Sequence, residues 1–128
     1  MVGGATERAR RAARRAVEST YDGLCTIVER RDIKDERTKL SRRGEVTVLE
    51  KQPCRLSYEK LSIVVQADAA AKISQGVKLF MAPEITVRGG SKIIVEQDGK
   101  RCEYAASGEP AVHFSHQEIP LELFRSWA

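Results

Sequence analysis

The alternation of apolar and polar residues predicts a chain made mainly of short β-strands. The clearest strand signal covers residues 46–58, where apolar residues recur with a period of two. The residues of this run that we expect to face the core are Val46, Val48, Cys54, Leu56 and Tyr58. Pro53 interrupts the run and indicates an edge position or a bulge, because proline donates no hydrogen bond to a neighbouring strand.

Shorter apolar runs between turn-forming residues predict the other strands. They cover residues 24–29, 72–81, 91–97, 100–107 and 111–116 with 119–124, the last two being separate strands or one strand with a bulge. Asp98-Gly99 is the strongest hairpin turn in the sequence, and Gly89-Gly90 predicts another turn. Residues 30–44 are charged and poor in apolar side chains, which predicts a mobile hairpin loop.

The N-terminal segment has a different period. Alanines recur at helical spacing from Ala5 to Glu18 and form one narrow face, so a helix is expected there. Its basic residues, candidates for contact with a partner or with DNA, are Arg8, Arg11, Arg14 and Arg15. The alternative is a solvated surface helix or a frayed terminus.

The connection from Tyr58 to Gly76 is unusual because it is mildly apolar and lacks turn residues before Gly76. Loops of this length inside a compact domain are uncommon and often functional. This segment is therefore expected to touch a partner. The ordinary alternative is a short helix over residues 67–72 that packs on the domain.

Together these elements predict a mainly β fold, a small antiparallel β-barrel or sandwich of about six strands. An N-terminal α-helix and one long inter-strand loop complete it. The expected division is a basic helical extension over residues 1–20 and a β domain over residues 21–128, with the long loop at 58–76.

Charge is distributed unevenly along the chain. The net charge is +4, and residues 1–43 contain 12 Lys and Arg against 7 Asp and Glu, while the remainder contains 10 against 11. A basic end beside a neutral body suggests contact with nucleic acid or an acidic protein surface. No apolar run is long enough to span a membrane.

Residues suited to catalysis or metal binding are few. His113 and His116 have a spacing that is poor for zinc, and turn or surface hydrogen bonding is the expected role for both. Cys25, Cys54 and Cys102 fall in predicted strands and are expected to be buried free thiols. We therefore expect no enzyme, with no catalytic, cofactor or metal site. Arg88, Lys92, Lys100 and Arg101 could form a weak basic patch.

Three phrases of the sequence resemble head–tail connector proteins of phages and prophages of Gram-positive hosts, including the head-closure or stopper type of minor capsid protein. They are QPCRLSYEKLS at 52–62, VKLFMAPEITVRGGSKIIVEQDGK at 77–100 and SGEPAVHFSHQEIPLELF at 107–124. The resemblance covers roughly residues 21–127 and rests on strand order and these phrases. The Arg-rich N-terminal extension is more helical and more basic than a minimal stopper requires, which leaves open whether it docks on the ring above or contacts DNA.

The resemblance implies a structural virion protein that forms a homo-oligomeric ring, often twelvefold, at the head–tail interface. A portal-bound adaptor would lie above the ring, a tail or tail-completion protein below it, and packaged double-stranded DNA in its channel, after assembly in the host cytoplasm. The long loop would project into the channel and retain DNA. The loop residues implied in that role are Lys60, Leu61, Ile63, Val64, Val65, Gln66, Asp68 and Lys72.

Two other functions remain open. One is a nucleic-acid-binding barrel that uses the basic helix, although the aromatic residues are scattered and are expected to pack in the core rather than stack on bases. The other is a neck adaptor that only fills the joint, with the long loop gripping a neighbouring protein.

Overall fold

The computed structural model describes residues 4–63 and 72–127, which form one N-terminal helix and seven strands. The elements are α1 (Gly4–Glu18), β1 (Gly23–Lys34), β2 (Ser41–Ile63), β3 (Lys72–Met81), β4 (Lys92–Gln97), β5 (Lys100–Ala106), β6 (Ala111–Val112) and β7 (Gln117–Leu123). All strand pairs are antiparallel, in the order β3-β2-β1-β4-β5-β7-β6. The mainly β fold and the helix were therefore predicted correctly.

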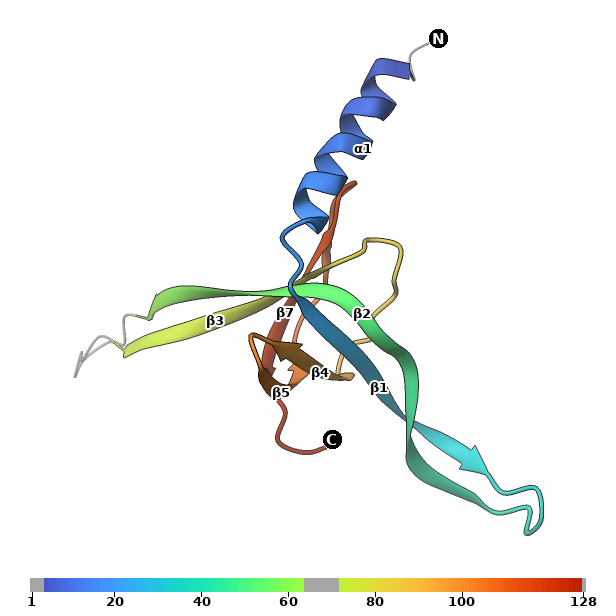
Figure 1. The fold of residues 1–128 in the computed structure, drawn as a ribbon. Coiled ribbons are helices and arrows are strands. Elements are labelled where there is room, and N and C mark those ends of the chain that lie inside the picture. The colour runs from blue at the N-terminus through green and yellow to red at the C-terminus, as the bar shows by residue number, and fades with distance from the viewer. Residues whose placement is uncertain (1–3, 64–71, 128) are drawn as a thin grey trace.

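An additional pairing between β3 and β7 closes the sheet on itself. Six strands thus form a ring of hydrogen-bonded pairs, and the short β6 pairs with Gln117 and Glu118 at the start of β7. This closed sheet, rather than two packed layers, is the body of the molecule (Figure 1). Closure leaves few free strand edges, which removes sites where other chains could add.

Local residue chemistry explains the turns and irregularities. Asp98 and Gly99 both have positive φ, 53° and 74°, as a two-residue hairpin turn requires, and Gln97 pairs with Lys100 across it. The irregularity expected near Pro53 is present as a shift in the β1–β2 register between Cys25 and Ile27. On β2, Lys51 has a φ of 45° and its N–H donates to Thr26 Oγ1 at 3.3 Å.

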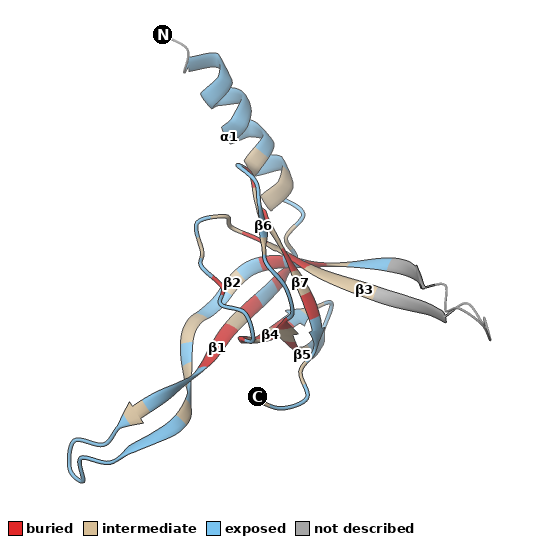
Figure 2. Ribbon diagram, turned by 180° about the vertical axis from the view of Figure 1, so that it is seen from behind, coloured by how far each residue is buried: buried red, intermediate tan, exposed pale blue. Residues whose placement is uncertain are grey.

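The core lies inside the ring of strands and is made mostly of aliphatic side chains. Figure 2 shows the buried positions gathered where the strands cross. The fully buried residues are Cys25, Ile27, Cys54, Leu79, Met81, Ile93, Val95, Gln117 and Ile119. Gln117 is the polar exception, and its amide donates to the carbonyl oxygens of Ala82 and Ile85 at 2.7 and 2.6 Å. These bonds fix the loop after β3 against β7.

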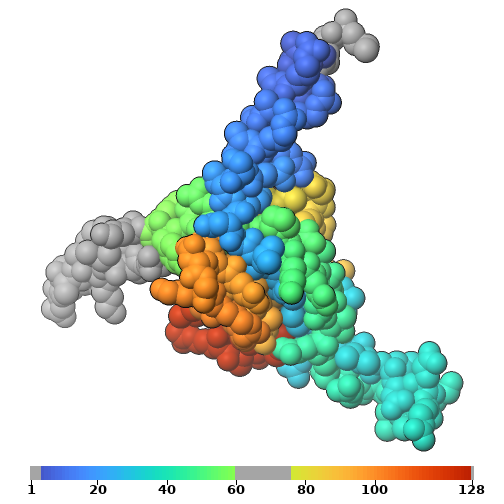
Figure 3. Space-filling model, in the orientation of Figure 1, coloured from blue at the N-terminus to red at the C-terminus, as the bar shows by residue number. Residues whose placement is uncertain are grey.

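Three extensions project from the closed sheet (Figure 1), and Figure 3 shows α1 and the ribbon between β1 and β2 as space-filling atoms. One is α1. The second, which we call the β1–β2 arm, covers residues 29–46 and lies beyond Val28, the last β1 residue paired with β4. The third, which we call the β2–β3 arm, consists of residues 59–63 paired with 72–76, beyond Val77, the last β3 residue paired with β7. Each arm is a two-stranded ribbon.

The arms correct two predictions. Residues 30–44 were expected to be a loop, but β1 continues to Lys34 and β2 begins at Ser41, so only the tip is a turn. Similarly, the predicted loop 58–76 begins and ends as paired strand, with Ile63 opposite Lys72. In residues 30–44, the two strands pair although the segment has few apolar side chains. In residues 58–76, they pair although the sequence lacks turn residues before Gly76.

Two aromatic residues expected in the core are exposed. Tyr58 is 52% exposed because β2 leaves the closed sheet at this position and continues into the β2–β3 arm. Phe114 is 54% exposed because it lies in the tight turn between β6 and β7. The predicted strand over 111–116 is reduced to Ala111–Val112 for the same reason. Tyr104, by contrast, is buried as expected.

Candidate functional site

The β2–β3 arm contains half of the residues that the sequence assigned to a channel-facing loop. Lys60, Leu61 and Ile63 lie on β2, and Lys72 is the first residue of β3. Their backbones are paired in register, with Leu61 opposite Ser74. The other four, Val64, Val65, Gln66 and Asp68, lie outside the described residues, as does most of the alternative helix over 67–72. The assigned segment is thus a strand-built arm over its described part.

Helix α1 exposes most of its basic residues to solvent, and Arg14 is the half-buried exception among the predicted contact residues. None of its residues is buried. Arg14 differs from the other predicted contact residues because its guanidinium donates to Glu84 Oε1 at 2.6 Å and to Glu18 Oε1 at 3.3 Å. The Arg14 guanidinium lowers the pKa of the Glu84 carboxyl. Arg10 lies over the Phe114 ring, 5.2 Å from its centroid. Arg14 and Arg10 therefore hold the helix to the body, while the predicted contact residues Arg8, Arg11 and Arg15 are exposed.

An arginine-lined recess lies at the base of the β1–β2 arm. It includes Arg88, which the sequence placed in a weak basic patch, whereas Lys100 and Arg101 of that patch line a different hollow. The recess has a volume of about 230 Å³ and is lined by Glu29, Arg30, Arg31, Arg43, Arg88, Gly89, Gly90, Ser91 and Trp127. Within it, Arg31 pairs with Glu29 at 2.7 Å, while Arg43 pairs with Asp32, outside the lining, at 3.3 Å. The excess of positive charge suits an anion such as a phosphate group.

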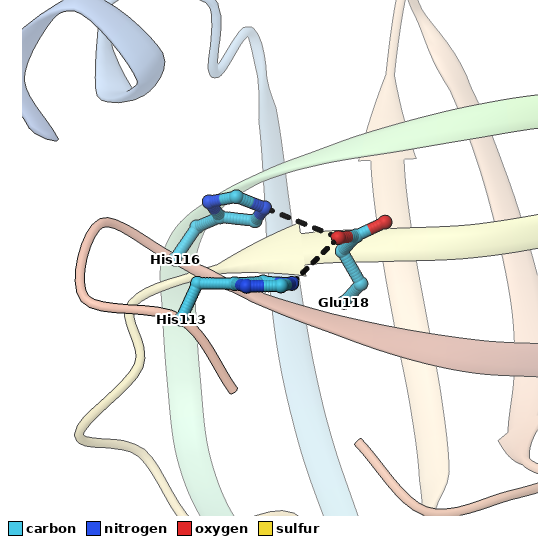
Figure 4. A group of neighbouring side chains, drawn as sticks. All are labelled: His113, His116 and Glu118. Atoms are coloured by element: carbon cyan, nitrogen blue, oxygen red, sulfur yellow. Dashed lines mark hydrogen bonds and ion pairs between the residues drawn. The ribbon is translucent and has the colours of Figure 1, made fainter. Parts of the chain in front are cut away.

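His113, His116 and Glu118 come together at the β6–β7 turn (Figure 4). The Nε2 atoms of the two histidines lie 3.1 and 3.3 Å from the same carboxylate oxygen, Oε2 of Glu118. The turn brings them together, since the His113 N–H donates to the His116 carbonyl at 2.8 Å. Ser115 Oγ lies 2.8 Å from His116 Nδ1.

Neighbouring strands hold this cluster in place. Glu118 pairs with Ala111 of β6 on one side and with Phe80 of β3 on the other. The Phe80 ring stacks on the imidazole of His116 with centroids 5.1 Å apart, and His113 stacks on His116 at 4.9 Å. The second oxygen of Glu118, Oε1, lies 3.9 Å from Lys78 Nζ. Both histidines and the carboxylate are therefore oriented by strand pairing and packing.

The cysteines lie away from these features. Cys25 and Cys54 are fully buried free thiols, as predicted, and Cys102 is half-buried. The hydrogen bond with Cys25, together with burial, raises the pKa of Cys54 and so disfavours a reactive thiolate. A hollow of about 800 Å³ beside β5 and β7 is lined mainly by apolar and small residues, together with Glu122 and Arg125. No helix in the described part of the chain is long and apolar enough to cross a membrane.

Two features were missed at the sequence level. Glu118 is close in sequence to the histidines, but its convergence with them depends on the tight turn at 113–116. The arginine recess combines residues from β1, β2 and the loop before β4, which are far apart in the sequence. Alternation on strands could place individual side chains on one face. It could not show which strands are neighbours.

The fold and these sites define a small antiparallel β protein with a closed sheet and projecting arms. No protein-family model matches the chain, and no curated protein matches it. Among solved structures, the chain is similar to the phage-like element PBSX protein xkdH from Bacillus subtilis, with a TM-score of 0.49 and 14% sequence identity. The likeness covers 78% of this chain and 91% of that protein. At this TM-score and identity it assigns neither a family nor a function.

Proposed function

We propose that this protein is a structural head–tail connector of a tailed phage or prophage, of the head-completion or stopper type. It would form a ring between a portal-bound adaptor and the tail. The β2–β3 arm would point toward the DNA channel and help to retain packaged DNA, and the ring would offer the docking surface for the tail. The three sequence phrases at 52–62, 77–100 and 107–124 support this family, and no catalytic role is proposed.

The observation that carries the proposal is the position of the β2–β3 arm outside the closed sheet. Its five residue pairs, from Glu59–Gly76 to Ile63–Lys72, lie beyond the last pairing of β3 with β7. A two-stranded ribbon is only marginally stable alone in water. The arm would gain most from neighbours that cover it, and a ring of identical copies supplies such neighbours through repeated head-to-tail contacts.

The test is a deletion of Leu61–Lys72 in the assembling particle. The strand pairs of the closed sheet lie outside this segment, so the domain should fold and the ring should assemble. Particles should then lose packaged DNA, measured as the fraction of DNA protected from nuclease. The matched control removes residues 36–39 from the tip of the β1–β2 arm, which shortens the other ribbon.

The two deletions separate the alternatives. DNA loss confined to the β2–β3 deletion supports retention by this arm. Full DNA retention with normal tail attachment rejects that role. Full DNA retention with failed tail attachment favours the neck adaptor whose arm grips a neighbouring protein. A protein that forms no ring with the portal or tail proteins overturns the connector assignment.

The arginine-lined recess favours a second candidate function, binding of nucleic acid. Arg30, Arg31, Arg43 and Arg88 line it, and the exposed arginines of α1 add positive charge elsewhere. Such binding should weaken steeply with salt because bound protein releases counterions from the phosphates. The isolated protein would be titrated into duplex DNA at several salt concentrations.

Matched variants would locate the binding surface. Joint replacement of Arg8, Arg11 and Arg15 by Ala tests the helix, and replacement of Arg30, Arg43 and Arg88 by Ala tests the recess with the same loss of charge. For every arginine that binds a phosphate, its replacement should reduce the salt slope by about one. Unchanged affinity in both triple variants would reject nucleic-acid binding through either surface.

A further inference from the structure

We propose that His113, His116 and Glu118 form a zinc site with three protein ligands and a water in the fourth position. This site would tie the β6–β7 turn to the closed sheet, and it is independent of the connector role. It revises the expectation from the sequence that the two histidines only make turn or surface hydrogen bonds. The ligand atoms are Nε2 of each histidine and Oε2 of Glu118, all within 4.8 Å of one another.

The distances between the ligand atoms suit tetrahedral zinc. Zinc binds imidazole nitrogen and carboxylate oxygen at about 2.0–2.2 Å, so two ligands of one tetrahedral ion lie about 3.3 Å apart. The two nitrogen-to-oxygen distances here are 3.1 and 3.3 Å. The ligand atoms of the three residues lie within 4.8 Å of one another, so zinc binding would also have to draw the two imidazole nitrogens to about 3.3 Å apart.

The surroundings orient each ligand as metal sites require. In the tautomer that donates Nδ1–H to Ser115 Oγ at 2.8 Å, the lone pair of His116 Nε2 faces Glu118 Oε2 at 3.3 Å, so a zinc ion can bridge the two atoms. In the other tautomer, Nε2–H donates to Glu118 directly when no metal is bound. Glu118 turns Oε2 toward the histidines while Oε1 lies toward Lys78 Nζ, at 3.9 Å. In known metal sites, hydrogen bonds and ion pairs from surrounding residues to the metal ligands fix the orientation of those ligands.

The exposed fractions of the three side chains support a site with three protein ligands and one position open to water. The side chains of His116 and Glu118 are 17% and 24% exposed, whereas that of His113 is 48% exposed. His116 is therefore sheltered by its stacking on Phe80, whereas His113 is the ligand most open to solvent. Three protein ligands with one open position is the pattern of a site in which water fills the fourth place.

The test measures zinc binding to the full-length, tag-free protein by calorimetric titration after removal of metals with a chelator. Wild type should bind one zinc ion per chain and unfold at a higher temperature when zinc is present. His113→Ala and Glu118→Gln should each weaken the zinc affinity by more than about 10-fold, and Ser115→Ala by about 10-fold. Circular dichroism checks that each variant is folded.

Two controls make the result specific. Glu122→Gln, on the same strand, and Cys102→Ser should leave zinc affinity unchanged. Cobalt bound in place of zinc should show a tetrahedral visible spectrum without a thiolate charge-transfer band, because no cysteine is a ligand. Absence of zinc binding, or binding that His113→Ala and Glu118→Gln leave unchanged, would overturn the proposal. A thiolate band would also overturn it.

Discussion

The closed sheet and its three extensions are built from the same chain but are stabilised in different ways. In the sheet, residues such as Leu79 and Ile93 are fully buried, and hydrogen bonds join each of the six strands of the ring to at least two neighbours. In contrast, α1 has no buried residue, and each arm is a ribbon of two strands. The free energy of folding therefore resides in the sheet. The extensions add surface that the monomer does not need for its own core, which is typical of parts that contact partners.

A core truncation should show the largest difference between the two regions. Leu79→Ala should lower the free energy of unfolding by about 3 kcal/mol because it removes buried methyl groups and leaves a cavity. Leu40→Ala, at the tip of the β1–β2 arm where Leu40 is 70% exposed, should change it by less than about 0.5 kcal/mol. Urea unfolding measures both. Equal effects would show that the arm tip packs against something in the free protein.

Loss of the buried Gln117 amide should have the next largest effect. Gln117→Leu leaves the carbonyl oxygens of Ala82 and Ile85 without their side-chain donor, which should cost about 2 kcal/mol. The matched control is Gln52→Leu, since the Gln52 amide donates at 3.2 Å to the carbonyl of Glu50, only two residues away. That change should cost less than about 1 kcal/mol. Similar costs for both would contradict a structural role for the loop tether.

At the junction between α1 and the sheet, replacement of Tyr21 should not lower the free energy of unfolding, unlike the two changes above. The Tyr21 hydroxyl is buried and finds no hydrogen-bond partner among the described residues. Tyr21→Phe should therefore leave stability unchanged or raise it by up to about 1 kcal/mol at neutral pH. A clear destabilisation in urea would show that the hydroxyl has a partner after all.

The Tyr21→Phe variant should also change how the free energy of unfolding depends on pH in alkaline solution. Burial raises the pKa of Tyr21 from 10.0 to about 12, so between these pH values the folded state keeps a proton that the unfolded state has lost. Its contribution to stability is fully present below pH 10 and is lost as the pH rises toward about 12. Tyr21→Phe should make that loss shallower. Tyr104, whose pKa burial also raises, should account for part of the remaining slope.

The ion pair that ties α1 to the body should matter least. Arg14 and Glu84 are partly exposed, so Arg14→Ala should cost less than about 0.5 kcal/mol, similar to Arg8→Ala as a control. Because Arg14 lowers the pKa of Glu84, the small contribution is present near neutral pH and is lost as the pH falls through the range of carboxyl titration. A cost above about 2 kcal/mol in urea would mean that the helix shares the stability of the sheet.

Sequence patterns predicted the local elements well where each element carries its own signal. The helix from Ala5 to Glu18 and the Asp98-Gly99 hairpin follow from helical alanine spacing and from residues that adopt positive φ. The β3 strand over 72–81 and the end of that strand before Pro83 were likewise predicted correctly. Such features depend on neighbours along the chain, which the sequence gives directly.

Predictions that depended on strand length or on distant neighbours were less successful. Residues 30–34 and 41–44 lack apolar alternation, yet their backbones pair because the hairpin register set by the sheet continues outward. Tyr58 keeps the parity of a core residue but is exposed because the core ends beside it. The candidate sites show the same division: the exposure of Arg8, Arg11 and Arg15 follows from the pattern of α1, whereas the convergence of Glu118 with the two histidines depends on the fold.

The sequence by itself determined that this is a mainly β protein with an N-terminal helix, a basic front part and buried free thiols at Cys25 and Cys54. Those properties follow from side-chain periodicity and charge. Only the tertiary structure decided that β3 pairs with β7 to close the sheet, that two ribbons project beyond it, and that His113, His116 and Glu118 converge. The physical reason is that closure and convergence depend on hydrogen bonds and packing between residues far apart in the chain, and periodicity does not specify which strands become neighbours.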